Sequence, residues 1–197
     1  MTLKEQCKRY KIKVIGTGKV NLDDLHIQYV PMVKPEQWWH GLDMMALRTS
    51  PHVELLEIIK EHGFDWAIIK QSGYWKERVD RRETHGRKDW TNEYIKRHIK
   101  RRWETYRSLK KKGYKKDLST KQPLLVLKEP LWNTRFNWND PNIRGLELVD
   151  GAGRASSAYV LGWKTIPVTW VQDAAPGSCT CKPIEGKFKE VLKGKPK

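Results

Sequence analysis

The sequence predicts a mixed α/β (α+β) fold, in which a small mixed sheet with flanking helices follows an N-terminal extension of helices and strands. Two observations support this class. The C-terminal half runs strand, turn, helix, strand, and the segment before it repeats apolar residues with helical period. The chain of 197 residues is long enough for one compact domain with an appended segment. We expect an N-terminal extension over residues 1–89 that packs on a core at 90–173, and a basic flexible tail at 174–197.

Composition and charge exclude some classes of protein. Hydrophobic residues make up 38% of the chain and ten residues are tryptophan, which is too much apolar surface for a disordered basic tail. The formal net charge is +16, and an excess of this size favours a polyanionic partner. Eleven Lys or Arg residues, against the single acid Glu104, lie between Lys96 and Lys116. One segment therefore carries most of the excess charge.

The N-terminal part predicts short strands and then one helix. Residues 10–15 and 26–30 alternate apolar and polar side chains, which is typical of strands, and glycines break the first of them. Ser50 and Pro51 suit the N-cap and the first position of a helix over 52–62. Gly63 ends that helix, and the following stretch as far as residue 87 predicts no clear element.

Residues 91–112 predict an amphipathic helix that ends at Gly113. Its apolar residues recur every three or four positions: Ile95, Ile99, Trp103, Tyr106 and Leu109. The basic face is either a solvated surface or a contact with nucleic acid, with DNA favoured over RNA. Unmixed positive charge along one helix favours the contact, because like charges destabilise a helix unless a polyanion neutralises them. The predicted contact residues are Lys96, Arg97, Lys100, Arg101, Arg107, Lys110, Lys111 and Lys112.

The C-terminal half predicts an α/β unit. Strands are expected at 124–127, 145–149 and 166–171, and a short helix at 155–161 lies between the last two. The loop at 128–144 is rich in asparagine and holds Trp132 and Trp138, whose rings suit stacking on nucleotide bases beside cations. Trp75 is a second candidate of this kind.

A glycine turn, Asp-Gly-Ala-Gly-Arg, precedes the predicted helix of that unit. Free N–H groups and the positive end of a helix dipole bind anions, and small residues let a phosphate approach the backbone. An arginine can pair with the phosphate and serine hydroxyls can donate to it. The predicted phosphate-binding residues are Asp150, Gly151, Ala152, Gly153, Arg154, Ser156 and Ser157. The alternative is a tight strand-to-helix connection with no ligand.

The stretch at 146–168 resembles the core of the ParB/sulfiredoxin superfamily. That family's pattern is a strand, Asp-Gly-x-(His/Arg)-Arg, a helix with small residues, Leu-Gly, and a strand with Ile/Val-Pro-Val. The positions in register are Asp150, Gly151, Arg154, Ala158, Leu161, Gly162, Ile166, Pro167 and Val168. Upstream, residues 123–127 are similar to the family's first strand, and the arrangement resembles ParB-like proteins of phages and mobile elements.

The resemblance implies a nucleotide site at the glycine turn. ParB proteins bind and hydrolyse CTP, sulfiredoxin uses ATP and the related free serine kinase uses ADP. The implied ligand is CTP, ATP or ADP, with or without Mg²⁺, and Gly151, Gly153 and Arg154 are the residues that would meet its phosphates.

The departures from the family concern catalysis. Ala152 stands where sulfiredoxins have the nucleophilic cysteine and chromosome-partitioning ParB proteins have a glutamate, and alanine cannot attack a phosphoryl group. Turnover would need a base from elsewhere, for which Asp150 and Glu147 are the candidates. The leading hypothesis is a ParB-like nucleotide- and DNA-binding protein. The alternatives are a nucleotide-dependent phosphotransferase or NTPase, a ParB-like nuclease, or a structural protein whose turn binds nothing.

Other features concern location and metals. No apolar run has the length of a membrane span, and the N-terminus has no apolar signal region. We therefore expect a cytoplasmic protein, in the host cytoplasm if a phage encodes it. Cys179 and Cys181 lack further ligands at zinc-site spacing, so no metal site is predicted. Whether the chain forms a homodimer stays open.

Overall fold

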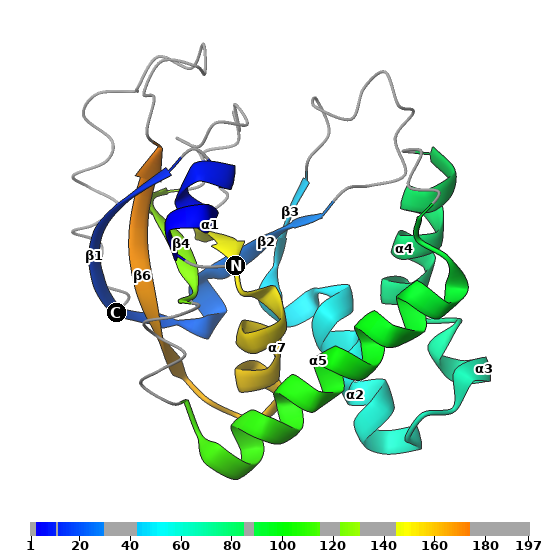
Figure 1. Ribbon diagram of the computed structural model, residues 1–197. Coiled ribbons are helices and arrows are strands. Elements are labelled where there is room, and N and C mark those ends of the chain that lie inside the picture. The colour runs from blue at the N-terminus through cyan, green and yellow to red at the C-terminus, as the bar shows by residue number, and fades with distance from the viewer. Residues whose placement is uncertain are drawn as a thin grey trace.

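The computed structural model describes residues 3–10, 12–29, 43–84, 89–114, 123–130 and 145–173. These residues form a mixed α/β structure with one six-stranded mixed sheet and helices on both of its faces (Figure 1), as the sequence predicts. Trp132, Trp138 and the tail from residue 174, with Cys179 and Cys181, lie outside the described residues.

The sheet combines strands from both halves of the chain. Its strands are β1 (Ile12–Asn21), β2 (Leu25–Tyr29), β3 (Asp43–Ala46), β4 (Leu125–Pro130), β5 (Leu146–Asp150) and β6 (Thr165–Asp173). Their order is β1-β6-β4-β5-β2-β3. The β6–β4 and β5–β2 pairs are parallel and the other three pairs are antiparallel. Segments before and after residue 90 therefore share one sheet, with β1 at one edge and β3 at the other.

The first strand is longer than the sequence predicts. β1 continues past Gly16 and Gly18, which we expected to end it, and pairs with β6 as far as Asn21. A Cβ on Gly18 would lie 2.5 Å from Nε1 of Trp170 on the neighbouring strand. Gly18 therefore makes room for a cross-strand indole instead of turning the chain.

Alternate residues of the segment 124–127, which leads into β4, face two different cores. Leu124 and Val126 pack against Ala155 and Ala158 of α7 (Ala152–Val160), on one face of the sheet. Leu125 and Leu127 pack on the opposite face, against α1 (Leu3–Tyr10). This burial on both faces explains the continuous apolar run at 124–127.

The remaining helices form a layer outside α7. They are α2 (Pro51–His62), α3 (Trp66–Ile69), α4 (Gly73–Thr84) and α5 (Asn92–Lys112). The single turn η1 (Leu22–Asp24) connects β1 to β2, and η3 (Leu47–Thr49) connects β3 to α2. In Figure 1, α5 runs diagonally across the molecule, with α7 on one flank and α3 on the other, and α2 passes behind it. The buried side chains between these helices form a second core: Leu55, Ile59, Ile69, Tyr74, Trp75, Ile95 and Ile99.

The predicted N-cap of α2 and the predicted glycine ends of both long helices are confirmed, and α5 has an N-cap of its own. Ser50 Oγ accepts a hydrogen bond from Val53 N at 3.4 Å at the start of α2, and Thr91 Oγ1 accepts one from Tyr94 N at 3.2 Å at the start of α5. Gly63 and Gly113 end the two helices with φ angles of 65° and 64°. None of the helices in the described ranges is long and apolar enough to cross a membrane.

Candidate anion-binding groove

The glycine turn is the connection between β5 and α7. Gly151 is the N-cap of α7 with φ 103° and ψ 14°, a left-handed conformation that glycine adopts without strain. A Cβ at this position would lie 2.8 Å from Cγ of Leu124. The helix begins at Ala152, three residues before the predicted start at 155, so Gly153 lies within its first turn.

Asp150 holds this turn in place. Its Oδ1 accepts a hydrogen bond from the backbone N–H of Gly151 at 2.7 Å, and its Oδ2 accepts one from Nε2 of Gln6 at 2.5 Å. The carboxylate thus joins α1 to the turn and has a structural role. Glu147, the other candidate base, is fully buried in β5 and does not line the groove described below.

Arg154 folds back over the turn. Its Nη2 donates a hydrogen bond to the carbonyl of Pro123 at 3.1 Å and lies 3.3 Å from the place of a Cβ on Gly151. Among the described residues, its Nη1 has no hydrogen-bond partner of ordinary geometry. Burial raises the pKa of the nearby Tyr114 hydroxyl, and the positive charge of Arg154 opposes that shift.

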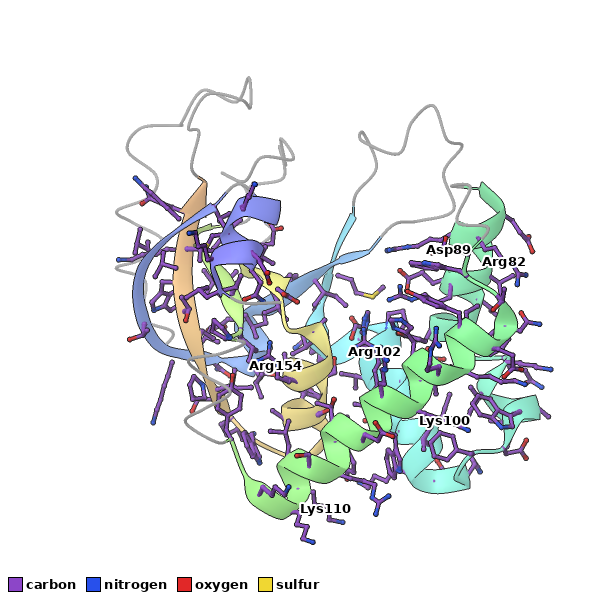
Figure 2. All side chains as sticks on the ribbon, in the orientation of Figure 1. Arg82, Asp89, Lys100, Arg102, Lys110 and Arg154 are labelled. Carbon is purple, nitrogen blue, oxygen red and sulfur yellow. The ribbon has the colours of Figure 1, made fainter. Side chains whose placement is uncertain are left out.

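Arg102 of α5 reaches the same turn from the opposite side. Its Nη1 lies 2.6 Å from the place of a Cβ on Gly153, and its Nε donates a hydrogen bond to the hydroxyl of Tyr74 at 2.8 Å. The Tyr74 ring is fully buried and lies between Arg102 and Arg78, whose guanidinium carbons are 5.1 and 4.9 Å from its centroid. Figure 2 shows Arg102 and Arg154 on their two helices.

The buried groups around Arg102 have shifted pKa values. Burial raises the pKa of Tyr74, but the guanidiniums of Arg102 and Arg78 and the hydrogen bond from Arg102 outweigh it, so the net pKa lies below the ordinary value. Burial, with the charges of Arg78 and Arg102, also lowers the pKa of His98. The guanidiniums of Arg78 and Arg102 contribute to both shifts, in addition to burial.

Sequence reasoning left Arg102 out of the predicted contacts. Its position, three residues after Ile99 and four before Tyr106, falls within the apolar stripe of the helix. A cation within an apolar stripe faces the protein interior and needs a polar partner there, so this position in the stripe is the sequence signal that identifies Arg102.

Arg102, Arg154 and the turn border an open groove of about 540 Å³ between α5 and α7, which we call the glycine-turn groove. Its lining residues are His98, Arg101, Arg102, Glu104, Thr105, Ser108, Leu109, Gly151, Gly153 and Arg154. Three guanidinium groups face one carboxylate in this lining. The groove is therefore positively charged and opens at the N-terminus of a helix, where an anion is stabilised.

The other predicted phosphate contacts lie at the back of the turn. Ser156 and Ser157 are fully buried and do not line the groove. The Ser157 hydroxyl donates to the carbonyl of Gly153 at 2.7 Å. Trp75, a candidate for base stacking, is 6% exposed and belongs to the helical core, so that interpretation is wrong.

The predicted nucleic-acid residues of α5 do not share one face. Arg101 lines the glycine-turn groove, whereas Arg107, Lys110 and Lys111 line a second groove on the other flank. Lys96 is paired with Glu93 at 2.7 Å. Arg97, Lys100 and Lys112 are exposed on the outside of the helix, and Lys100 and Lys110 mark its course in Figure 2.

The fold and the groove together define a mixed α/β protein with a positively charged groove at a helix N-terminus. No protein-family model and no curated protein matches the sequence, and no solved structure matches the fold.

Proposed function

We propose that the protein is a ParB-like nucleotide- and nucleic-acid-binding protein, with the phosphates of the ligand in the glycine-turn groove. The observation that carries this proposal is the meeting of two guanidiniums, Arg102 of α5 and Arg154 of α7, on either side of the glycine turn. The two residues are far apart in sequence, and the fold brings them to one site.

The charges at this site favour an anion. Guanidinium groups at the positive end of α7 repel one another and the helix dipole, and a bound phosphate would relieve both effects. The first N–H groups of α7 have no partner within the helix. Gly151 and Gly153, at the start of this helix, both line the groove. Guanidiniums bind phosphate through two parallel hydrogen bonds, which fixes its orientation.

The resemblance of residues 146–168 to the ParB/sulfiredoxin core supports a nucleotide as the ligand and a ParB/sulfiredoxin-like sheet as the fold. CTP, ATP and ADP, with or without Mg²⁺, are the candidates. In the groove lining, Glu104 is the only carboxylate. We therefore propose binding with weak or no turnover.

Titration of CTP, ATP and ADP into the wild type, Arg102→Ala and Arg154→Ala tests the nucleotide site. Loss of one charge-assisted contact is expected to weaken binding about tenfold or more. Lys164→Ala is the matched control, because Lys164 is exposed and lies outside the groove. Phosphate release, recorded in parallel, would favour the phosphotransferase or NTPase alternative. Equal binding by all four proteins, or none by the wild type, would refute the site.

Contact of α5 with nucleic acid has a separate test. The affinity for a DNA duplex should fall with added salt, with a log–log slope of about −0.9 for each phosphate contacted. Replacing exposed cations of α5, such as Arg97 and Lys100, should make that slope shallower. Affinity that does not depend on salt would exclude a phosphate contact by the helix.

A further inference from the structure

The second groove on α5 lies on the flank that faces α2. It has a volume of about 720 Å³, and its lining residues are Lys60, Trp103, Tyr106, Arg107, Lys110 and Lys111. Every charged residue in this lining is basic, and the four cations are all exposed. The glycine-turn groove differs in this respect, because it contains Glu104.

Two aromatic rings, Trp103 and Tyr106, line this second groove, and Phe64 lies next to Trp103. Trp103 and Tyr106 are stacked, with their centroids 4.8 Å apart and their planes 13° apart. Phe64, from the segment after α2, meets Trp103 edge-on at 6.4 Å and is 38% exposed, one of three large hydrophobic residues exposed in the described part of the chain. We call this site the aromatic–basic groove.

The combination of rings and cations selects for one chemistry. Cations alone would suit any polyanion, including duplex DNA, whose phosphates lie on the outside. The half-buried indole of Trp103 beside the cations, with the exposed ring of Phe64 next to it, adds stacking, and only unpaired bases present a free face to these rings. In a duplex the base faces are covered by neighbouring bases, and an acidic protein segment has no bases that could stack on the rings.

We propose that the aromatic–basic groove binds single-stranded nucleic acid. Bases lie against Trp103 and Phe64, and the backbone phosphates lie between Lys60 of α2 and the cations Arg107, Lys110 and Lys111 of α5. This inference rests on one part of the proposed function, namely that the polyanion bound by α5 is a nucleic acid. It does not require a nucleotide in the glycine-turn groove.

Fluorescence anisotropy tests the proposal with two labelled probes. One is an oligothymidylate of about 20 nucleotides, which is longer than most single-strand sites, and the other is a duplex of equal length. We expect the single strand to bind more tightly than the duplex. Trp103→Leu should weaken single-strand binding about tenfold, because a base loses its stacking platform. Trp103→Phe, which keeps an aromatic ring, should recover most of the affinity, and Phe64→Leu repeats the test at a more exposed position.

A charge-matched pair of double variants tests the cations. Lys60→Gln with Lys110→Gln should weaken single-strand binding more than Lys13→Gln with Lys164→Gln, which removes the same charge from exposed sites outside both grooves. Circular dichroism of each variant verifies that the fold is retained.

Three results would overturn the inference. The first is a duplex that binds at least as tightly as the single strand. The second is that Trp103→Leu and Phe64→Leu bind the single strand as tightly as the wild type does. The third is displacement of the oligonucleotide by polyglutamate at equal charge concentration. None of these affects nucleotide binding by Arg102 and Arg154, so the two proposals fail separately.

Discussion

Arg102 and Gly153 are in direct contact across the junction of α5 and α7. Nη1 of the arginine occupies space that any larger residue would fill, 2.6 Å from the place of a Cβ on Gly153. Because Gly153 lies in the first turn of α7, this contact brings a cation to the positive end of a helix, which is electrostatically unfavourable without an anion. The pair therefore links the packing of two helices to the charge of the glycine-turn groove.

Gly153→Ala separates the stability of the fold from binding. Alanine in a helix is about 0.5–1 kcal/mol more favourable than glycine, and the atom it meets is the end of a flexible side chain. We expect the free energy of unfolding to stay constant or rise, while the displaced Arg102 lowers nucleotide affinity about tenfold. Denaturant unfolding and nucleotide titration measure the two effects. A variant that binds as tightly as the wild type would show that the Arg102 position is unimportant.

Gly151→Ala should destabilise the protein through its backbone. The left-handed φ of 103° costs an L-residue about 1–2 kcal/mol, and the new Cβ would also meet Leu124 at 2.8 Å. Gly63→Ala is the control, because Gly63 has a φ of 65° with nothing within 4 Å of the new Cβ. Urea unfolding should show a larger loss of stability for Gly151→Ala. Equal losses would mean that the Leu124 contact relaxes freely.

Tyr74→Phe removes the acceptor that fixes Arg102. A hydrogen bond to a charged group contributes about 1.5–3 kcal/mol, so we expect a loss of about 2 kcal/mol in unfolding free energy. Nucleotide affinity should also fall, since the guanidinium loses its orientation. Tyr94→Phe, whose ring contacts with Trp90 and His98 a phenylalanine retains, should change neither quantity. A stable Tyr74→Phe variant with weakened binding would assign Tyr74 to positioning alone.

His52 should make stability depend on pH. Its burial, together with the charges of Arg102, Arg78 and Arg81, lowers its pKa well below the ordinary value, and its Nδ1 has no hydrogen-bond partner within the described ranges. Protonation is therefore favoured in the unfolded chain. Stability is complete above the unfolded pKa of about 6.5 and falls as the pH drops below it, by at most about 1.4 kcal/mol per pH unit.

His52→Phe should flatten this dependence between pH 7 and pH 5, since the ring that packs edge-on against Tyr74 at 5.2 Å remains but cannot titrate. His26 and His98 also have lowered pKa values, so part of the dependence persists. His62→Gln, at the exposed end of α2, is the control. Unfolding curves of His52→Phe with an unchanged slope would contradict the assignment.

Local sequence rules predict the elements whose ends and faces are set by neighbouring residues. Ser50, Gly63, Thr91 and Gly113 fix the limits of two helices through caps that need no tertiary contact. The stretch between Gly63 and residue 87, which contains α3 and α4, predicts no clear element. The few apolar residues of α4 lie among many charged ones. The position of α4 depends on packing of Tyr74 and Trp75 in the helical core.

Tertiary contacts account for what local rules miss. Gly18 is a turn residue by composition, but the indole of Trp170 makes it a strand residue. The glycine turn was predicted from its spacing, whereas its partner Arg102 could be placed there only by the packing of α5 on α7. No local sequence pattern predicts a groove that forms between two segments distant in the sequence.

The pairing of β1 with β6 bears on the order in which the sheet forms. Among the described strands, β1 is synthesised first and pairs with β6, which is synthesised last, so that Ile12 lies opposite Asp173. Contacts of such long sequence separation slow folding, because loop-closure entropy is lost before they form. We expect the backbone of β1 to stay unpaired until β6 has been synthesised, and during that time chaperones or oligomers can reach it. Closure of the sheet is a late, long-range step of folding.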